Sequence, residues 1–175
     1  MTENVSVLIT EEEISGRISA LAAQISKEYE NESVTLVCLL KGAVSFMTDL
    51  ARKLDLPAVE FDFMDVSSYE GTESTGEVKI NKDLTGSIVG KNILIIEDIV
   101  DTGRTLERIT QYLNSKKPKT LKVCALLSKP ERRLAFGFDL SYVGFVIPNE
   151  FVVGYGLDYE QRYRNLPYIG VLSFL

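Results

Sequence analysis

The stretch from residue 92 to residue 105, Asn-Ile-Leu-Ile-Ile-Glu-Asp-Ile-Val-Asp-Thr-Gly-Arg-Thr, holds the side chains with the clearest chemistry in the chain. Its apolar run at 93–96 is typical of a strand buried on both faces of a parallel sheet. Three carboxylates follow within five residues, those of Glu97, Asp98 and Asp101. A Thr-Gly-Arg-Thr loop then leads into an apolar-periodic segment. The pattern predicts a strand, an acidic turn, a loop and a helix N-terminus, and open α/β sheets bind ligands at such strand ends.

The loop at 102–105 suits a phosphate monoester. Backbone N–H groups at the start of a helix are unpaired and carry the positive end of the helix dipole. Thr102 and Thr105 add hydroxyl donors, and Gly103 permits backbone angles that other residues resist. The loop has neither the Lys-Ser/Thr ending of a P-loop nor the glycine spacing of a dinucleotide turn.

The carboxylate pair Glu97 and Asp98 suits two further groups. Hard cations such as magnesium take oxygen ligands, and ionised carboxylates accept hydrogen bonds from hydroxyls. A phosphate, a vicinal diol and a magnesium ion in one site together indicate a ribose 5-phosphate donor.

Alternating strands and helices are predicted to position this site. Residues 10–13, Thr-Glu-Glu-Glu, form a capping box, and the helix that it opens has an apolar face of Ile14, Ile18, Leu21, Ile25 and Tyr29. Strands are predicted at 34–40, 59–64, 92–97, 121–127 and 142–147, with further helices at 43–54 and 105–114. The polar segment 65–83 holds a short hairpin strand at 77–80. This order predicts an α/β fold with a mostly parallel central sheet flanked by helices.

Length and composition fit one domain with a sizeable core, because 45% of the 175 residues are hydrophobic. We expect residues 1–175 to form it, with a core at about 10–147 and a hood at about 148–175 that folds over the strand ends. The chain shows no signal peptide and no apolar run near the length of a membrane helix, which predicts a soluble, cytoplasmic protein. Cys38 and Cys124 lie in apolar runs and are predicted to be buried free thiols.

Two counts exclude whole classes of function. The chain has no histidine, so it has no Ser-His-Asp or Cys-His nucleophile and no His-bearing zinc site. Proton transfer then falls to Asp, Glu, Lys or Tyr. The net charge of −6 argues against a nucleic-acid surface, since binding to phosphate backbones needs clustered Lys and Arg.

Residues 93–105 resemble the phosphoribosyl-pyrophosphate (PRPP) signature of the type I phosphoribosyltransferase family, an apolar-acidic-acidic-apolar-apolar-Asp-Thr-Gly pattern. Three further matches narrow the resemblance to the hypoxanthine-guanine members of this family. They are Leu-Leu-Lys-Gly at 39–42, Ser-Tyr at 68–69, and the block 143–159 followed by Arg-Asn-Leu-Pro at 164–167. The likeness covers essentially the whole chain.

The resemblance implies a fold with a hood and an enzyme of purine salvage. The reaction would transfer the 5-phosphoribosyl group from PRPP to hypoxanthine or guanine, giving IMP or GMP and pyrophosphate, with magnesium as cofactor. We expect these small molecules as partners, no nucleic acid or membrane, and a homodimer or homotetramer.

The resemblance also assigns roles around the PRPP. Lys41 and Gly42 would bind pyrophosphate through backbone amides, although an ordinary strand-to-helix turn also accommodates Lys-Gly. Whether the Leu40–Lys41 peptide is cis stays open. Ser68 and Tyr69 would belong to a lid that shields the oxocarbenium-like transition state from water, while a solvated loop is the plain alternative.

The purine side of the site follows from the same resemblance. Lys129 would donate to the purine 6-oxo group, Phe151 would stack on the ring, and main-chain carbonyls of Val152 and Asp158 would accept from the guanine 2-amino group. The Asp158 carboxylate would bind a second magnesium and Arg164 would clamp pyrophosphate. The plain alternatives are a surface lysine and core packing of Phe151 and Val152.

Asp101 is the predicted general base. It lies between the carboxylate pair and the phosphate loop, so we expect its side chain to face the purine near N7. Arg104 departs from a common family variant, since Lys is frequent there, and we expect little effect because the loop works mainly through backbone amides.

Two other functions stay open. A sister phosphoribosyltransferase for xanthine would need a donor facing the purine 2-oxo group, where carbonyls are expected. A PRPP-binding regulator of transcription would need a basic face or a further DNA-binding domain. The preference between hypoxanthine and guanine, the tolerance of xanthine and the choice between dimer and tetramer also stay open.

Overall fold

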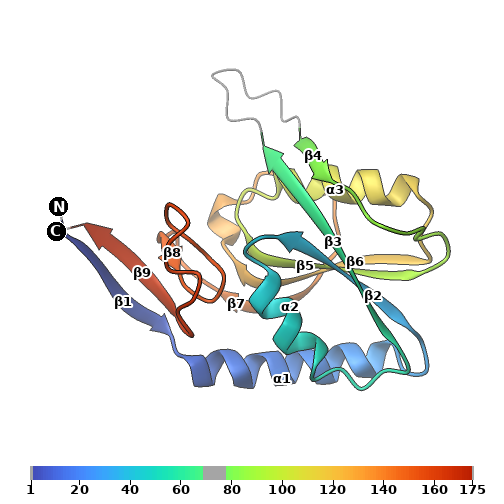
Figure 1. The fold of residues 1–175 in the computed structure, drawn as a ribbon, viewed down its shortest axis with the longest axis horizontal. Coiled ribbons are helices and arrows are strands. Elements are labelled where there is room, and N and C mark those ends of the chain that lie inside the picture. The colour runs from blue at the N-terminus through green and yellow to red at the C-terminus, as the bar shows by residue number, and fades with distance from the viewer. Residues whose placement is uncertain (1, 69–77, 175) are drawn as a thin grey trace.

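A six-stranded sheet forms the centre of the molecule, in the order β4-β3-β2-β5-β6-β7 (Figure 1). The computed structural model describes residues 2–68 and 78–174. The strand bounds are β2 Val34–Leu40, β3 Val59–Ser68, β4 Val78–Lys82, β5 Asn92–Val100, β6 Thr120–Ser128 and β7 Leu140–Val146. All neighbours pair in parallel except β3 and β4, which pair antiparallel. The predicted α/β fold with a mostly parallel sheet is confirmed.

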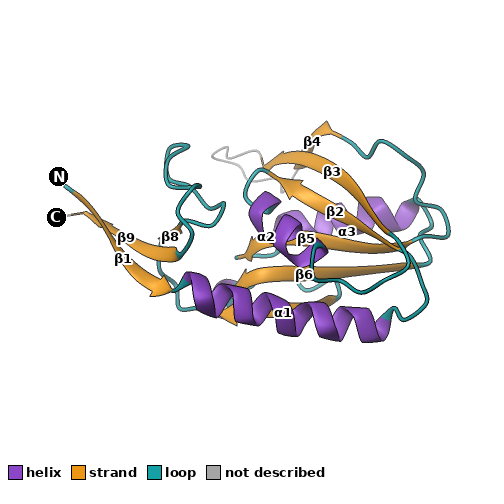
Figure 2. Cartoon of the chain, turned by 60° about the horizontal axis from the view of Figure 1, so that its bottom comes forward, coloured by secondary structure: helices purple, strands orange, loops and turns teal. Residues whose placement is uncertain are grey.

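Helices cover both faces of this sheet (Figure 2). α1 (Glu11–Glu28) and α2 (Val44–Ala51) pack on one face, and α3 (Arg104–Ser115) packs on the other. α1 begins at the predicted capping box, in which the Glu13 amide donates to Thr10 Oγ1 and the Thr10 amide donates to Glu13 Oε2. The four predicted apolar positions within α1 are buried, and so is Tyr29 at its C-cap, so the helix packs along the face that its periodicity indicates. No helix within the described ranges combines the length and apolarity that a membrane crossing requires.

Two elements extend beyond their predicted ends. β3 continues to Ser68 and pairs with β4, so residues 65–68 of the predicted polar segment are strand. The hairpin strand predicted at 77–80 is found as β4. Val66 and Ile80 are partners in this pairing and pack on the core beside α3, which stabilises the hairpin. β5 continues past the carboxylate pair to Val100, because β6 goes on pairing with it. Asp98 therefore lies in the strand together with Glu97, the last residue of the predicted strand, and the acidic turn predicted after it is wrong.

α2 is shorter than predicted and ends at Ala51, not near residue 54. Past this point the amides of Lys53 and Leu54 donate to carbonyls only three residues back, the geometry of a tight final turn.

A second, three-stranded antiparallel sheet forms the hood (Figure 1). It consists of β1 (Glu3–Ile9), β9 (Ile169–Phe174) and β8 (Val152–Val153), in the order β1-β9-β8. β1 has no local signal in the sequence, because the strand that pairs with it, β9, lies at the other end of the described chain. The residues from 148 onward thus share their sheet with the N-terminal segment.

Candidate active site

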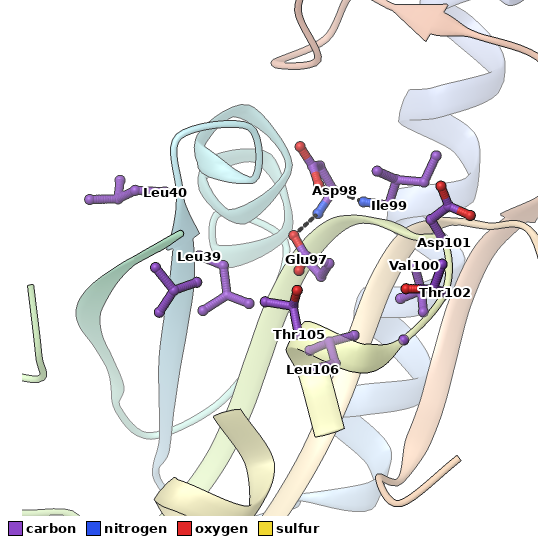
Figure 3. Close-up of a pocket in the computed structure, with 12 residues that line it drawn as sticks. Leu39, Leu40, Glu97, Asp98, Ile99, Val100, Asp101, Thr102, Thr105 and Leu106 are labelled. Atoms are coloured by element: carbon purple, nitrogen blue, oxygen red, sulfur yellow. Dashed lines mark hydrogen bonds between the residues drawn. The ribbon is translucent and has the colours of Figure 1, made fainter. Parts of the chain in front are cut away.

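A cavity of about 230 Å³ opens between the carboxyl ends of β2 and β5 (Figure 3). The two strands pair only as far as Cys38 and Ile96, and the cavity lies beyond that point. From here the chain continues to β3 on one side and to β6 on the other, which makes this the switch point of the sheet. The lining residues are Leu39, Leu40, Val66, Glu97, Asp98, Ile99, Val100, Asp101, Thr102, Gly103, Thr105 and Leu106.

Glu97 and Asp98 form an acidic pair in the wall of this cavity. The Asp98 amide donates to Glu97 Oε1 at 3.1 Å, and the Ile99 amide donates to Asp98 Oδ1 at 2.7 Å. Desolvation raises the pKa of Glu97 well above its ordinary value, and the neighbouring Asp98 charge raises it further. Desolvation likewise raises the pKa of Asp98, against the opposing influence of its hydrogen bonds and of Arg164. The nearby positive charge does not fully compensate the ionised pair, and a bound cation would stabilise it.

The raised pKa values predict a stability penalty at neutral and higher pH. The unfolded chain ionises these groups near their ordinary values of 4.5 and 3.8, whereas the folded protein holds their protons to higher pH. Stability therefore falls as pH rises from there through the folded-state pKa values. Glu97→Gln should lessen this fall and raise the free energy of unfolding at about pH 8 by about 0.5–2 kcal/mol. Urea unfolding of both proteins at about pH 5 and pH 8 measures the difference.

Glu60→Gln is the control for this prediction, because the pKa of Glu60 is shifted in the opposite direction. Hydrogen bonds from Lys91 and Thr35 lower the pKa of Glu60, so Glu60→Gln removes a contribution that is present above about pH 4.5 and lost as pH falls. If the stability of Glu97→Gln depends on pH as that of the unmodified protein does, then burial beside Asp98 does not destabilise the ionised Glu97 carboxylate.

The turn after β2 packs directly on Asp98. The Leu40–Lys41 peptide is cis, which answers the question that the sequence left open. A Cβ atom at Gly42 would lie 1.6 Å from Asp98 Oδ2, so only glycine lets the carboxylate approach this turn. From the hood, Gly156 approaches so closely that a Cβ there would lie 2.0 Å from the Gly42 carbonyl oxygen. Lys41 itself is exposed.

The predicted phosphate loop, residues 102–105, enters α3 as expected. Gly103 is the N-cap and has a φ of 81°, the left-handed region that glycine favours. The Thr102 carbonyl accepts the amides of Leu134 and Ala135, which holds the loop from outside. Among the described residues, no acceptor pairs with the amides of Gly103 or Thr105. Free N–H groups at a helix N-terminus bind anions, so the geometry supports the predicted use.

Asp101 lies at the cavity wall and pairs with a residue that the sequence analysis missed. Arg132 Nε donates to Asp101 Oδ1 at 2.5 Å, and both side chains are more than 40% exposed. Arg133 Nε donates to the Asp101 carbonyl at 3.3 Å and its Nη2 donates to Ser128 Oγ at 2.8 Å. The only signal in the sequence is the basic pair that follows Lys129 by three residues.

Lys129 is buried next to this group, not exposed as an ordinary surface lysine would be. Its Nζ donates to the Glu150 carbonyl at 2.6 Å and its amide donates to the Val100 carbonyl. Burial lowers the pKa of its ammonium group. Phe151, which follows Glu150, is 53% exposed, while Val152 is buried in β8. The half-exposed ring is available for stacking, and the plain core-packing alternative fits Val152 but not Phe151.

Asp158 and Arg164 contact each other. Arg164 Nη2 lies 2.8 Å from Asp158 Oδ1, and the Gln161 amide donates to Asp158 Oδ2 at 2.8 Å. Gln161, which the sequence analysis missed, also accepts from Arg164 at 3.2 Å and from Lys41 at 3.5 Å. Gln161 lies in a turn and has a positive φ, a backbone conformation that the type of residue at this position does not indicate. The sequence therefore gives no local sign of its contacts. A metal ion at Asp158 would share the carboxylate with Arg164 and with the Gln161 amide.

The predicted lid lies mostly outside the described residues. Ser68 is the last residue of β3, and Tyr69 falls in the range that the structure does not describe. Within the described ranges, no group of three His, Cys, Asp or Glu side chains is placed to hold a metal. Glu97 and Asp98 fit magnesium in another way, since that ion commonly binds one or two carboxylates together with substrate phosphates.

Comparisons with known proteins agree with this geometry. Residues 8–160 match a family described as the phosphoribosyl transferase domain. The hypoxanthine-guanine phosphoribosyltransferase of Staphylococcus aureus is 54% identical over 168 residues, which cover 95% of this chain and 93% of that protein. The crystal structure of a hypoxanthine-guanine phosphoribosyltransferase from Bacillus anthracis superposes with a TM-score of 0.92 at 41% identity and covers 99% of this chain and 100% of that one.

A third relative is much longer. The bifunctional protein TilS/HprT of Listeria innocua is 53% identical over 168 residues, and the chain spans only 26% of its length. The similarity to that protein therefore concerns one part of it.

Proposed function

The chain belongs to the phosphoribosyltransferase family, and from this premise we propose that it transfers the 5-phosphoribosyl group of PRPP to hypoxanthine or guanine. The products are IMP or GMP and pyrophosphate, which makes the enzyme one of purine salvage. The observation that carries the proposal is the cavity itself. Its wall holds both the acidic pair Glu97 and Asp98 and the amides at the start of α3. The acidic pair suits the diol of a ribose, and the amides suit the 5′-phosphate of the same ribose.

PRPP would be held along the wall of the cavity. Residues 102–105 receive the 5′-phosphate, with Arg104 pointing outward as an exposed side chain. Glu97 and Asp98 accept the ribose hydroxyls and would hold one magnesium ion, while the Asp158 carboxylate would hold a second. Magnesium bound there would neutralise charge on the departing pyrophosphate. Lys41, Gly42 and Arg164 bind the same leaving group, and preorganised charges of this kind supply much of an enzyme's rate enhancement.

The purine would bind between Lys129 and Phe151. Lys129 donates to the 6-oxo group, the ring stacks on Phe151, and the carbonyls of Val152 and Asp158 accept the guanine 2-amino group. Asp101 takes the proton from the purine ring as N9 attacks the anomeric carbon. The contact between Arg132 and the Asp101 carboxylate weakens when that proton arrives, because the hydrogen bond is then no longer between two charged groups.

The proposal also covers where the enzyme acts, what it binds and how it assembles. It acts on small molecules in the cytoplasm and binds neither nucleic acid nor membrane. Residues 1–175 form one domain, with the core at about 10–147 and the hood segment at about 148–175, and the chain assembles as a homodimer or homotetramer. Static light scattering distinguishes these two assemblies.

A panel of four purines tests the proposed function. With PRPP and magnesium, hypoxanthine and guanine should react, while adenine should be rejected strongly because it presents a donor to the Lys129 donor. Faster turnover of xanthine than of hypoxanthine and guanine would favour the sister enzyme. No turnover, combined with nucleic-acid binding at a stated salt concentration, would favour the regulator.

Gly103→Val should cripple PRPP binding. A β-branched residue resists a φ of 81°, and its Cβ would lie 2.8 Å from the Ala135 carbonyl oxygen and 3.0 Å from Phe138 Cε1. The affinity for IMP should fall in parallel, since IMP carries the same 5′-phosphate. Isothermal titration of both ligands measures this, and Gly90→Val is the matched control. Gly90 also has positive φ, at 72°, but nothing lies within 4 Å of its Cβ position. Normal affinity of Gly103→Val for both ligands would place the phosphate elsewhere.

A further inference from the structure

A series of aromatic contacts extends from Phe151 into the hood. The Phe151 ring meets the Tyr159 ring edge-on, with centroids 5.8 Å apart and an interplanar angle of 89°. Tyr159 in turn meets Phe174 of β9 at 5.5 Å and 66°. Edge-to-face contacts favour one relative orientation of two rings. The plane of the half-exposed Phe151 ring therefore depends on Tyr159.

Arg162 holds Tyr159 in place. Its guanidinium carbon lies 5.6 Å from the centroid of the Tyr159 ring. The two residues also exchange backbone hydrogen bonds, since the Tyr159 amide donates to the Arg162 carbonyl at 3.2 Å and the Arg162 amide donates back at 2.9 Å. A cation over the ring face and a closed backbone pair together restrict the Tyr159 side chain.

Glu3 of β1 anchors Arg162. Arg162 Nη2 lies 2.6 Å from Glu3 Oε1, and the Tyr163 hydroxyl donates to Oε2 of the same carboxylate. The Arg162 hydrogen bond, followed by that of Tyr163, lowers the pKa of Glu3. Glu3 is also the β1 partner of Phe174 in the hood sheet. Two routes from Tyr159, through Arg162 and through Phe174, thus meet at the same pair of residues on β1 and β9.

We propose that Tyr159 is a positioning residue for the nucleobase, supported by Arg162 and Glu3. The inference rests on the proposed function, in which Phe151 stacks on the purine. A ring whose plane is already fixed loses less freedom when the purine binds, so affinity rises without a new contact to the ligand. Strand β1 then contributes to purine affinity although none of its residues lines the cavity.

The test compares Tyr159→Ala with Tyr159→Phe, which removes only the hydroxyl. Tyr159→Ala should raise the KM for hypoxanthine and guanine about 3- to 10-fold, the range that an aromatic pair supplies. The KM for PRPP and the purine KM of Tyr159→Phe should both stay within about twofold of the unmodified protein. Arg162→Gln and Glu3→Gln should raise the purine KM in the same direction.

Lys116→Gln is the matched control for Arg162→Gln. Lys116, the C-cap residue of α3, also pairs with a carboxylate, that of Asp83 at 3.3 Å, and also lies over a ring, that of Tyr112 at 4.6 Å. It has no connection to Phe151 through these contacts, so its loss should leave the purine KM unchanged. An equal rise of the purine KM in Lys116→Gln would mean that the loss of any surface ion pair produces the effect.

A double-mutant cycle with Phe151→Leu separates positioning from general loosening of the hood. If Tyr159 acts through Phe151, then Tyr159→Ala should add nothing in the Phe151→Leu background. The same added effect in both backgrounds, an equal rise in the KM for PRPP, or an unchanged purine KM in Tyr159→Ala would each overturn the inference. An unmodified protein that forms neither IMP nor GMP would overturn the proposed function itself, and that assay precedes the variants.

Discussion

Asp101→Asn is expected to lower turnover by about 10²–10⁴, equivalent to about 3–5.5 kcal/mol of transition-state stabilisation. Asparagine keeps the shape and the hydrogen-bonding capacity of the side chain but cannot take the purine proton. The Asp101 carboxylate is 42% exposed at the cavity wall, so losing its pair with Arg132 should cost little stability. Single-turnover kinetics at saturating substrate, with PRPP affinity measured separately, determine the effect.

The double variant Glu97→Gln with Asp98→Asn is the comparison. It should weaken PRPP and magnesium binding, whereas Asp101→Asn should change PRPP affinity only modestly. If Asp101→Asn instead abolishes PRPP binding and leaves chemistry at saturation intact, then Asp101 orders the loop. The proton would in that case leave by another route, to solvent.

Lys129→Ala is expected to remove most activity on hypoxanthine and most discrimination against 6-amino purines. A site built around a donor to a substrate group rejects an analogue that cannot accept from it by about 10⁴–10⁵, because a buried polar group is then left unpaired. Lys129 has the required burial, at 8% exposure, and its ammonium already donates to a carbonyl in the segment that leads to Phe151. The measurement is kcat/KM for hypoxanthine and for adenine.

Lys122→Ala provides the control for Lys129→Ala. Lys122 lies on the same strand, β6, but pairs with Glu28 of α1 away from the cavity. Its replacement should leave both kcat/KM values unchanged. An unchanged kcat/KM for hypoxanthine in Lys129→Ala would contradict the assignment of Lys129 to the 6-oxo group.

Elements with a strong local pattern could be predicted from the sequence. The largely apolar run of β2 predicts both of its ends, and the capping box with its apolar stripe predicts the start and the buried face of α1. Much of the cavity could be predicted as well, because Glu97, Asp98, Asp101 and the phosphate loop are close in sequence at one strand end. Local periodicity and turn chemistry suffice for such features.

Features that depend on distant residues could not be predicted. β1 is a strand because β9 pairs with it, and β5 continues through Asp98 to Val100 because β6 pairs beside it. The contacts of Arg132 and Gln161 arise from loops whose course no periodicity indicates. The resemblance implies separate roles for Asp158 at magnesium and Arg164 at pyrophosphate, and only the fold shows that the two side chains pair with each other.

The pairing of β1 with β9 also orders events during synthesis of the chain. Ser173 of β9 donates to the Asn4 carbonyl of β1, 169 residues earlier, and the two ends of the described chain lie side by side (Figure 1). β1 leaves the ribosome before every strand of the central sheet, and its partner leaves after all of them. Contacts between such distant segments form late because a long loop must close first. A nascent chain can therefore complete its central sheet, with the acidic pair and phosphate loop in place, while the support for Phe151 is still missing.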